Sequence, residues 1–229
     1  MRSKKGNVDR YYSDFYSQMI GKDSTGILSR LWRYPHKLME KPFKTNDGFK
    51  ILELGTGEGE HIEFVADDYS EYIALDLDSS RLGHVAAMGI KKVHPQQGDA
   101  NLLNFPNSSF DRVIATCLLA HLKEPESALL EWRRVLKPGG SLSIYIPCEP
   151  GIALRVFRNL FTKRKATKLG YDGYDLFIAR DHLNAAERLC VLLSHAFEDD
   201  LIDFNFMPFK LKSWYLNLFI VVQISKLNH

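Results

Sequence analysis

Three glycines at alternating positions, preceded by an acidic residue, have the spacing of a ligand-binding loop. The segment Ile51-Leu-Glu-Leu-Gly-Thr-Gly-Glu-Gly59 joins an apolar run to a loop with few side chains. Glycine tolerates positive φ and lets the backbone approach a ligand closely. A buried strand that leads into a glycine-rich turn and a helix is a nucleotide-binding arrangement in open α/β sheets. The segment therefore predicts a nucleotide site.

The spacing of this loop excludes two common nucleotide motifs. A dinucleotide fingerprint needs its third glycine where this chain has Glu60, and a P-loop needs a Gly-Lys-Ser/Thr sequence that is absent here. Glu53 also places a carboxylate in a buried strand, which costs free energy unless it meets a donor or a cation. A sulfonium cofactor with an amino group and a ribose supplies both.

At these residues the chain resembles the class I S-adenosylmethionine-dependent methyltransferases, whose first motif has the same acid and glycine pattern. The alternative is an ordinary tight turn between a strand and a helix. The resemblance implies that the cofactor is S-adenosyl-L-methionine, converted to S-adenosyl-L-homocysteine. It also implies cofactor contacts from the residues of the motif: Glu53, Gly55, Thr56, Gly57 and Gly59.

A second apolar run, Tyr72-Ile-Ala-Leu-Asp76, predicts the neighbouring parallel strand, reached through a helix from Gly59 to about Asp67. Asp76 would then lie beside the glycine loop, where a carboxylate can accept both hydroxyls of a ribose. The alternative is that Asp76 caps the next helix. Asp78 and Ser79 are better placed for that role.

The resemblance implies further contacts at the base of the cofactor. The residue that matches Asp99 would receive the adenine amino group, and the amide of Ala100 would meet a ring nitrogen. The alternative for Asp99 is a turn aspartate, which is common. The resemblance implies additional cofactor contacts from Leu77, Cys117 and Leu118.

The rest of the chain alternates segments of strand and helix character. This order predicts an α/β fold, a doubly wound, mostly parallel seven-stranded sheet with helices on both faces. Phe-Asp-x-Val at 110–113 and Leu-Lys-Pro-Gly-Gly at 136–140 are also similar to the methyltransferase family. The expected elements are strands at 113–117, 142–146, 200–206 and 214–224, and helices at 124–136 and from a cap at Asp181 to about 195.

Composition limits the class of protein. The 229 residues are 45% hydrophobic with a net charge of +2, so no nucleic-acid partner is expected. No apolar stretch is long enough for a membrane span, and a signal peptide is not apparent, so we expect a cytoplasmic protein. The cysteines, Cys117, Cys148 and Cys190, have no metal or disulfide spacing. We expect no metal site, and we consider a nucleophilic cysteine the less favoured alternative for Cys117 and Cys148.

A helical lid is expected at 1–46, before a methyltransferase domain at 47–229. A helical region from Leu28 to Glu40 is expected to break near Pro35, because proline disrupts helix interiors. Ligands bind at the carboxyl ends of the strands, where a lid could contribute the aromatic and polar residues Tyr11, Tyr12, His36 and Glu40. The alternative for the tyrosines is packing on the sheet.

His121 is the leading candidate for a general base, because it follows the fourth strand at the rim of the site and histidine transfers protons near neutral pH. The alternative is a packing role at the start of a helix. His36 is the second catalytic candidate, and His61 is a further one.

A basic insertion at about 151–175 interrupts the alternation. Its basic and apolar residues are interleaved, and residues 151–168 contain no acid. The simplest interpretation is a solvated helix face. Two more specific interpretations are that Arg155 and Tyr171 contact an anionic acceptor, or that residues 151–168 contact a membrane surface.

These features favour a small-molecule methyltransferase that acts on oxygen or nitrogen, with an acceptor such as a nucleotide sugar or cell-surface glycan precursor. One alternative is a quinone or lipid methyltransferase at the membrane surface. Another is a non-catalytic module that binds S-adenosylmethionine. The methylated atom and the oligomeric state stay open.

Overall fold

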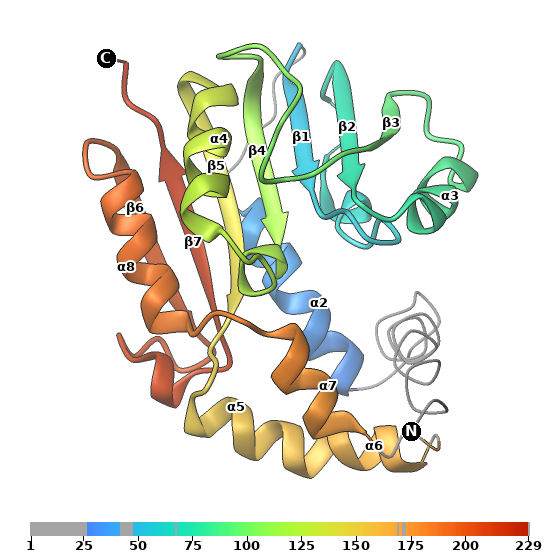
Figure 1. Cartoon of the computed structure of the whole chain (residues 1–229), viewed down its shortest axis with the longest axis vertical. Helices are drawn as coiled ribbons and strands as arrows, with labels where there is room; N and C mark the ends of the chain where they lie inside the picture. The colour runs from blue at the N-terminus through green and yellow to red at the C-terminus, as the bar shows by residue number, and fades with distance from the viewer. Residues whose placement is uncertain (1–26, 42–47, 67, 169, 171–172, 229) are drawn as a thin grey trace.

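The computed structural model describes residues 27–41, 48–66, 68–168, 170 and 173–228 (Figure 1). These residues contain one seven-stranded sheet in the order β3-β2-β1-β4-β5-β7-β6. Neighbours among β1 to β5 are parallel, whereas β7 is antiparallel to both β5 and β6. The predicted doubly wound sheet is therefore confirmed. The strands are β1 (Lys50–Leu54), β2 (Glu71–Asp76), β3 (Val93–Gln97), β4 (Phe110–Thr116), β5 (Leu136–Pro147), β6 (Leu201–Met207) and β7 (Phe219–Ser225).

Helices cover both faces of the sheet. One face packs against α4 and α8, and the other against α2, η1 and α3 (Figure 1). The α-helices are α2 (Ile27–Glu40), α3 (Ser79–Ala87), α4 (Pro125–Val135), α5 (Ile152–Phe157), α6 (Lys163–Lys168), α7 (Tyr174–Asp181) and α8 (Ala186–Ala196). The short 3₁₀ segments are η1 (Ile62–Phe64), η2 (Leu118–Ala120) and η4 (Trp214–Leu216), and η3 (Arg158–Thr162) is a π-helical turn.

Alternation within the strands builds two cores. Leu52 and Leu54 of β1 belong to the core under α4 and α8, whereas Ile51 belongs to the core under α2 and η1. Successive side chains of a strand point to opposite faces, so a strand covered on both faces must be apolar throughout. This explains the continuous apolar runs from which the parallel strands were predicted.

The helix predicted after the glycine loop is wrong, because only the single turn η1 forms there. Gly57 and Gly59 both have positive φ, 58° and 87°. Val65 is already extended, with φ −79° and ψ 130°. Residues 60–64 are too few for a stable α-helix.

Helix α2 continues through Pro35, so the predicted break is also wrong. Tyr34, Leu38 and buried Met39 on either side of this proline pack against the core of the sheet. Their burial holds the segment helical despite the propensity of proline, as tertiary contacts commonly do.

The chain after α4 turns earlier than expected. Leu136 is extended and fully buried, and it already pairs with Phe110, so β5 begins before Pro-Gly-Gly rather than at residue 142. At the other end of the sheet, residues 214–216 form η4 rather than strand, and β7 begins at Phe219.

The basic insertion is helical, as α5, η3, α6 and α7 in succession, and α5 and α6 run end to end below the sheet in Figure 1. Tyr174 and Asp175 begin α7 rather than lying in a loop. Asp181 ends α7 and caps no helix, because α8 starts at Ala186 with no side-chain cap. None of the helices in the described part of the chain combines the length and apolarity that a membrane span requires.

A buried ion pair fixes α2 to the sheet. Both terminal nitrogens of Arg112 donate to the carboxylate of Glu40, at 2.7 and 2.6 Å, and Arg112 also donates to Ser143. Burial alone would raise the pKa of Glu40, but hydrogen bonds with His61 and Arg112 hold it at about 2. The pair therefore stays charged in water at neutral pH.

Replacing Glu40 by Gln should destabilise the protein by about 3–5 kcal/mol, because the fully buried Arg112 guanidinium would lose its counter-charge. Urea unfolding at neutral pH measures this loss. The control is the double variant Glu40→Leu/Arg112→Met, which should cost less than the sum of its single substitutions. A loss of stability below about 1 kcal/mol for Glu40→Gln would show that this pair contributes no more than a solvent-exposed ion pair does.

Candidate active site

A cavity of about 730 Å³ opens at the carboxyl ends of β1, β2 and β4. The strand order reverses between β1 and β4, the position where open α/β sheets bind ligands. Its walls contain most of the predicted site residues: Gly55, Thr56, Gly57, Asp76, Leu77, Asp99, Ala100, Cys117, Leu118, His121 and His36. The structure thus brings together residues from five segments of the chain.

The glycines of the loop have different roles. A Cβ on Gly55, where φ is 63°, would lie 2.8 Å from a methyl group of Leu118, so this position must stay bare. A Cβ on Gly59 would lie 2.6 Å from Met88, which follows α3. Because Met88 is flexible, it is the φ of 87° at Gly59 that favours glycine there, and Gly59 is not among the described residues that line the cavity.

Glu53 also lies outside the cavity wall, beneath the loop. It is fully buried, and its Oε2 accepts hydrogen bonds from the hydroxyls of Thr56 and Tyr72, both at 2.7 Å. Burial raises the pKa of this carboxyl group. Glu53 therefore supports the loop through protein donors on Oε2, whereas its Oε1 is buried without a hydrogen-bond partner among the described residues, and its contact with a ligand stays a prediction.

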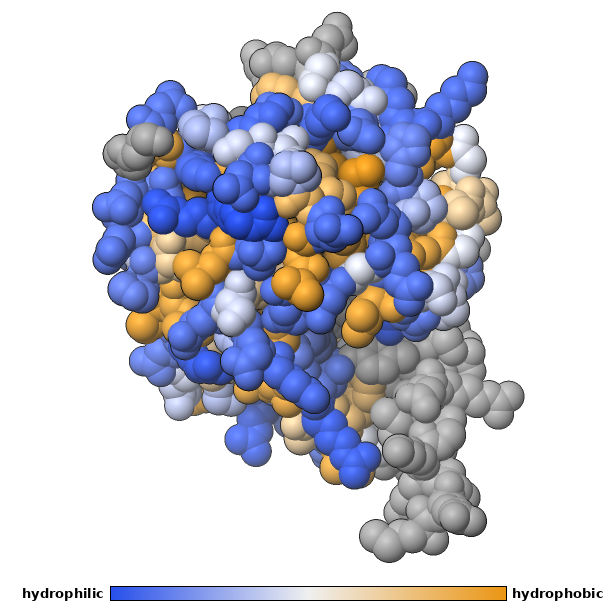
Figure 2. Space-filling view, turned by 45° about the horizontal axis from the view of Figure 1, so that its top comes forward, coloured by the Kyte–Doolittle hydropathy of each residue, from blue (hydrophilic) through white to orange (hydrophobic). Residues whose placement is uncertain are grey.

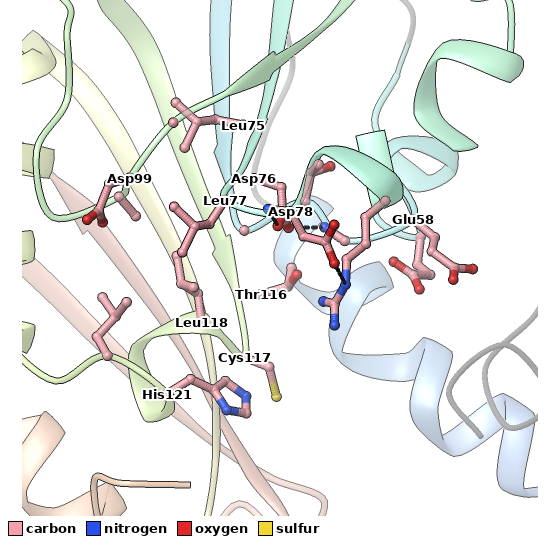
Figure 3. Close-up of a pocket in the computed structure, with 18 of the residues that line it drawn as sticks. Glu58, Leu75, Asp76, Leu77, Asp78, Asp99, Thr116, Cys117, Leu118 and His121 are labelled. Carbon is pink, nitrogen blue, oxygen red and sulfur yellow. Dashed lines mark hydrogen bonds and ion pairs between the residues drawn. The ribbon is translucent and has the colours of Figure 1, made fainter. Parts of the chain in front are cut away.

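Asp76 is presented to the cavity by backbone donors. Its Oδ2 accepts from the amide of Gly57, and its Oδ1 accepts from the amide of Asp78, each at 2.9 Å (Figure 3). Asp78 caps α3 by accepting from the amide of Ser80. Asp78 therefore caps the helix. The Asp76 carboxylate lines the cavity, and its orientation is set by the glycine loop.

The opposite end of the cavity suits a flat, polar-edged ring. Trp132 donates to the carbonyl oxygen of Ala100, which pins the turn that carries Asp99. Leu77 is 69% exposed and projects into the cavity with Asp99 nearby (Figure 3). The side-chain oxygen of Asn101 is buried without a hydrogen-bond partner in the described chain, so it can accept from a ligand donor. An apolar wall beside unfilled polar positions fits the nucleoside part of S-adenosylmethionine.

His121 lies at the rim opposite this end, after η2, and its ring faces the thiol of Cys117 (Figure 3). Its Nδ1 is 3.0 Å from a carboxylate oxygen of Asp181. Burial alone would lower the pKa of His121, but hydrogen bonds with Asp181 and Cys117 outweigh it and raise the pKa to about 10. Without a ligand, the histidine is therefore an imidazolium at neutral pH.

A second pair of residues supports this dyad. The rings of His121 and His182 meet edge to face at 4.7 Å, and His182 Nδ1 lies 2.7 Å from a carboxylate oxygen of Glu149. Glu149 is in turn paired with Arg158 of η3. Burial, followed by the positive charge of His121, lowers the pKa of His182 to about 3.

His121, Asp181 and His182 could also hold a metal ion, since their ligand atoms lie within 4.8 Å of one another. Each imidazole already has a carboxylate neighbour at hydrogen-bond distance. We interpret the group as a chain of ion pairs and ring contacts, in which His182 Nδ1 lies close to Glu149 but forms no hydrogen bond within the described residues.

His36 reaches the cavity from α2 and stacks on Phe64 at 5.3 Å. Its Nδ1 is 2.9 Å from Nδ1 of His61, whose Nε2 contacts Glu40 at 3.0 Å. Burial, followed by the nearby His61, lowers the pKa of His36 to about 3, so the ring is neutral. His61 lies behind His36, almost fully buried, and does not line the cavity.

Of the expected acceptor residues, His36 lines this cavity. Tyr11, Tyr12 and Tyr171 lie outside the described residues, and Arg155 is exposed on α5 away from the cavity lining. Sequence reasoning missed Asp181, which was expected to cap a helix. It also missed Glu60 and Trp32, which line the cavity. Glu60 could have been found from the sequence, because it is an acid directly after the glycine loop. Burial raises its pKa to about 7.

Comparisons with known proteins agree with this geometry. Residues 52–144 match the family model described as methyltransferase domain. A demethylmenaquinone methyltransferase of Clavibacter sepedonicus is 32% identical over 177 residues, which are 74% of this chain and 70% of that protein. A phosphatidylethanolamine N-methyltransferase of Cereibacter sphaeroides is 33% identical over 105 residues, 42% of this chain and 50% of that protein.

A solved S-adenosylmethionine-dependent methyltransferase of Aquifex aeolicus is similar with a TM-score of 0.57 at 16% identity, over 96% of this chain and 97% of that one. This likeness concerns the fold alone. The chain spans about half the length of many curated relatives it matches, between 38% and 54% in three further cases.

Replacing Asp181 by Asn should lower the pKa of His121 from about 10 towards its ordinary value of 6.5, because the carboxylate that stabilises the imidazolium is lost. An NMR titration of the histidine ring protons measures this change. Glu198→Gln, which removes the carboxylate beside exposed His195, is the matched control and should leave the His121 titration unchanged. An unshifted His121 in Asp181→Asn would show that the dyad does not form in solution.

The contribution of His36 and His182 to stability should fall as the pH drops below 6.5. The folded-state pKa values of His36 and His182, both about 3, lie below the ordinary 6.5, so the unfolded chain binds more protons between these limits. Each such histidine removes about 1.4 kcal/mol per pH unit. The His36→Gln variant should lose less stability than the wild type on acidification, as measured by urea unfolding at about pH 7 and about pH 5. Equal slopes for the two proteins would contradict the burial of a neutral His36.

Proposed function

The chain belongs to the class I S-adenosylmethionine-dependent methyltransferases, and on that premise we propose that it transfers the methyl group of S-adenosyl-L-methionine to an acceptor of the quinone or lipid class. The observation that carries the proposal is one cavity with two kinds of wall. Residues suited to a nucleoside line one end, and a His121–Asp181 dyad lies at the other. Donor and acceptor can therefore meet inside a single cavity.

The cofactor, when bound, supplies an electrophilic methyl carbon on a cationic sulfur. In the proposal, the Asp76 carboxylate accepts the ribose hydroxyls, since backbone amides already fix its orientation. Asp99 and Asn101 meet the edge of the base, and Leu77 covers its face. These residues act by proximity and orientation, which supply much of the rate enhancement of a transfer reaction.

His121 is proposed to take the proton that an oxygen or nitrogen acceptor releases on methylation. An imidazolium cannot accept a proton, so the pKa of His121 must fall when the cavity is occupied. A positive charge close to the ring has this effect, because like charges disfavour the protonated form. Asp181 is paired with Nδ1 of His121. Nε2 is therefore the atom proposed to take the proton from the acceptor.

The acceptor class is proposed from the relatives and the cavity lining. Relatives in the comparison act, by their names, on demethylmenaquinone and phosphatidylethanolamine. The cavity lining includes the apolar and aromatic side chains Trp32, Leu118, Leu122 and Tyr145, which suit an apolar acceptor. A nucleotide sugar or glycan precursor gains no support from either observation. A cytoplasmic location is proposed with this activity, consistent with three free cysteines.

The proposal is tested by binding and transfer assays on separate variants. Asp76→Ala should weaken binding of S-adenosylmethionine at least about tenfold in calorimetry, through lost hydrogen bonds to the ribose. His121→Ala should retain that affinity and lose about 10²–10⁴-fold in turnover. The turnover assay follows radiolabelled methyl transfer to demethylated quinols and to phosphatidylethanolamine.

His195→Ala, on the exposed end of α8, is the control and should match the wild type in both assays. Transfer to neither acceptor, by a protein that binds the cofactor, would overturn the acceptor class. Wild-type turnover in His121→Ala would overturn the role of the histidine.

A further inference from the structure

We propose that α5, η3 and α6 form a docking surface for an anionic lipid bilayer, next to the acceptor side of the cavity. This inference rests on the proposed function for its purpose, since a quinone or lipid acceptor is dissolved in a membrane. Its structural basis is separate and lies in the exposed side chains of residues 152–168, called here the docking helix.

The docking helix exposes a line of apolar side chains. Ile152, Val156 and Leu160 follow one another at intervals of four residues and are 56%, 50% and 46% exposed. Residues spaced by four lie on the same side of a helix. The opposite side is buried against the protein through Leu154 and Ala166. The apolar line therefore faces outward from a helix that is already packed.

Neighbouring segments extend this apolar surface. The turn η4 packs against α5, and its Tyr215 and Leu216 are exposed. Helix α7 packs against α6, and its Leu176 is exposed. The side chains come from three segments that meet along the docking helix, which gives the surface width as well as length.

Positive charge accompanies the apolar line. Arg155, Arg164 and Lys168 are exposed on the docking helix, and no acidic residue occurs between 151 and 168. Helices with an apolar face and flanking basic residues lie in the interface of anionic membranes. Basic groups near such a surface are attracted by its negative potential. The surface thus has the charge and the apolarity that complement an anionic bilayer.

A solvated helix face does not account for this combination. Exposed apolar residues also occur elsewhere, such as Leu130 on α4 and Val191 on α8, without a row of neighbours at helical spacing on the same helix. Figure 2 shows a largely hydrophilic face on which the apolar groups are small and separate. Scattered apolar residues of this kind are normal on protein surfaces. A continuous line with basic neighbours is different and indicates a binding surface.

Contacts connect the docking surface to the candidate catalytic residues. Arg158 of η3 points inward to Glu149, which contacts His182, and the His182 ring packs on His121. The surface is therefore linked to the acceptor wall of the cavity through Arg158, Glu149 and His182. A docked molecule would place that wall close to the membrane, so that an acceptor could enter without crossing water.

Vesicle co-sedimentation with the full chain tests the proposal. The wild type should bind phosphatidylcholine vesicles that contain phosphatidylglycerol, and bind pure phosphatidylcholine vesicles at least about tenfold more weakly. The apolar variant Ile152→Glu/Val156→Glu/Leu160→Glu and the charge variant Arg155→Glu/Arg164→Glu/Lys168→Glu should each lose about tenfold or more. The matched control is Leu130→Glu/Val191→Glu, which adds charge at equally exposed apolar positions and should bind as the wild type does.

Calorimetry with S-adenosylmethionine checks that each variant is folded. Absence of wild-type binding to anionic vesicles, or an equal loss in the control, would overturn the docking surface and would be the outcome if a protein partner covers it instead. Vesicle binding requires no methyl acceptor. Failure of docking and failure of the proposed methyl transfer are therefore read from different measurements.

Discussion

The cavity depends on the ion pair between Arg112 and Glu40, because this contact fixes α2 to the middle of the sheet. A buried guanidinium without its carboxylate strongly destabilises the fold. The ion pair therefore fixes the position of the last turn of α2 against the sheet. His36 and Trp32 lie one and two turns earlier on the same side of the helix and reach the cavity from there. One wall of the site is thus set by a contact outside it.

The opposite wall depends on a second ionic chain with different chemistry. Asp181, Glu149 and Arg158 hold two histidines whose pKa values move in opposite directions, to about 10 for His121 and about 3 for His182. Titratable neighbours whose environments separate their pKa values are typical of acid–base sites. The same chain anchors η3, so the helices after β5 and His121, the proposed general base, are positioned together.

The sheet and the cofactor end of the cavity were predictable because their signals are local. The apolar runs of β1 and β2, the glycines and Asp76 lie close together in the sequence, and burial on both faces requires the pattern that was read. The helix at 59–67, the break at Pro35 and the cap at Asp181 were wrong for one shared reason. The helix was inferred from the length of chain between two strands, and the break and the cap from propensity, whereas backbone strain or contacts with distant residues decided the structure.

The acceptor end could not be read in the same way, because its residues come from separate parts of the chain. His121, Glu149, Asp181 and His182 are ordinary residues until β4, β5 and α7 bring them together. The donor end of the cavity is built from a continuous sequence motif. The acceptor end is built from residues that come together only in the folded chain. Changes in the segment after β5 can therefore alter the acceptor while the donor site keeps its form. This separation explains why the methyl donor is evident in the sequence, whereas an acceptor class can be proposed only with the folded chain and its relatives.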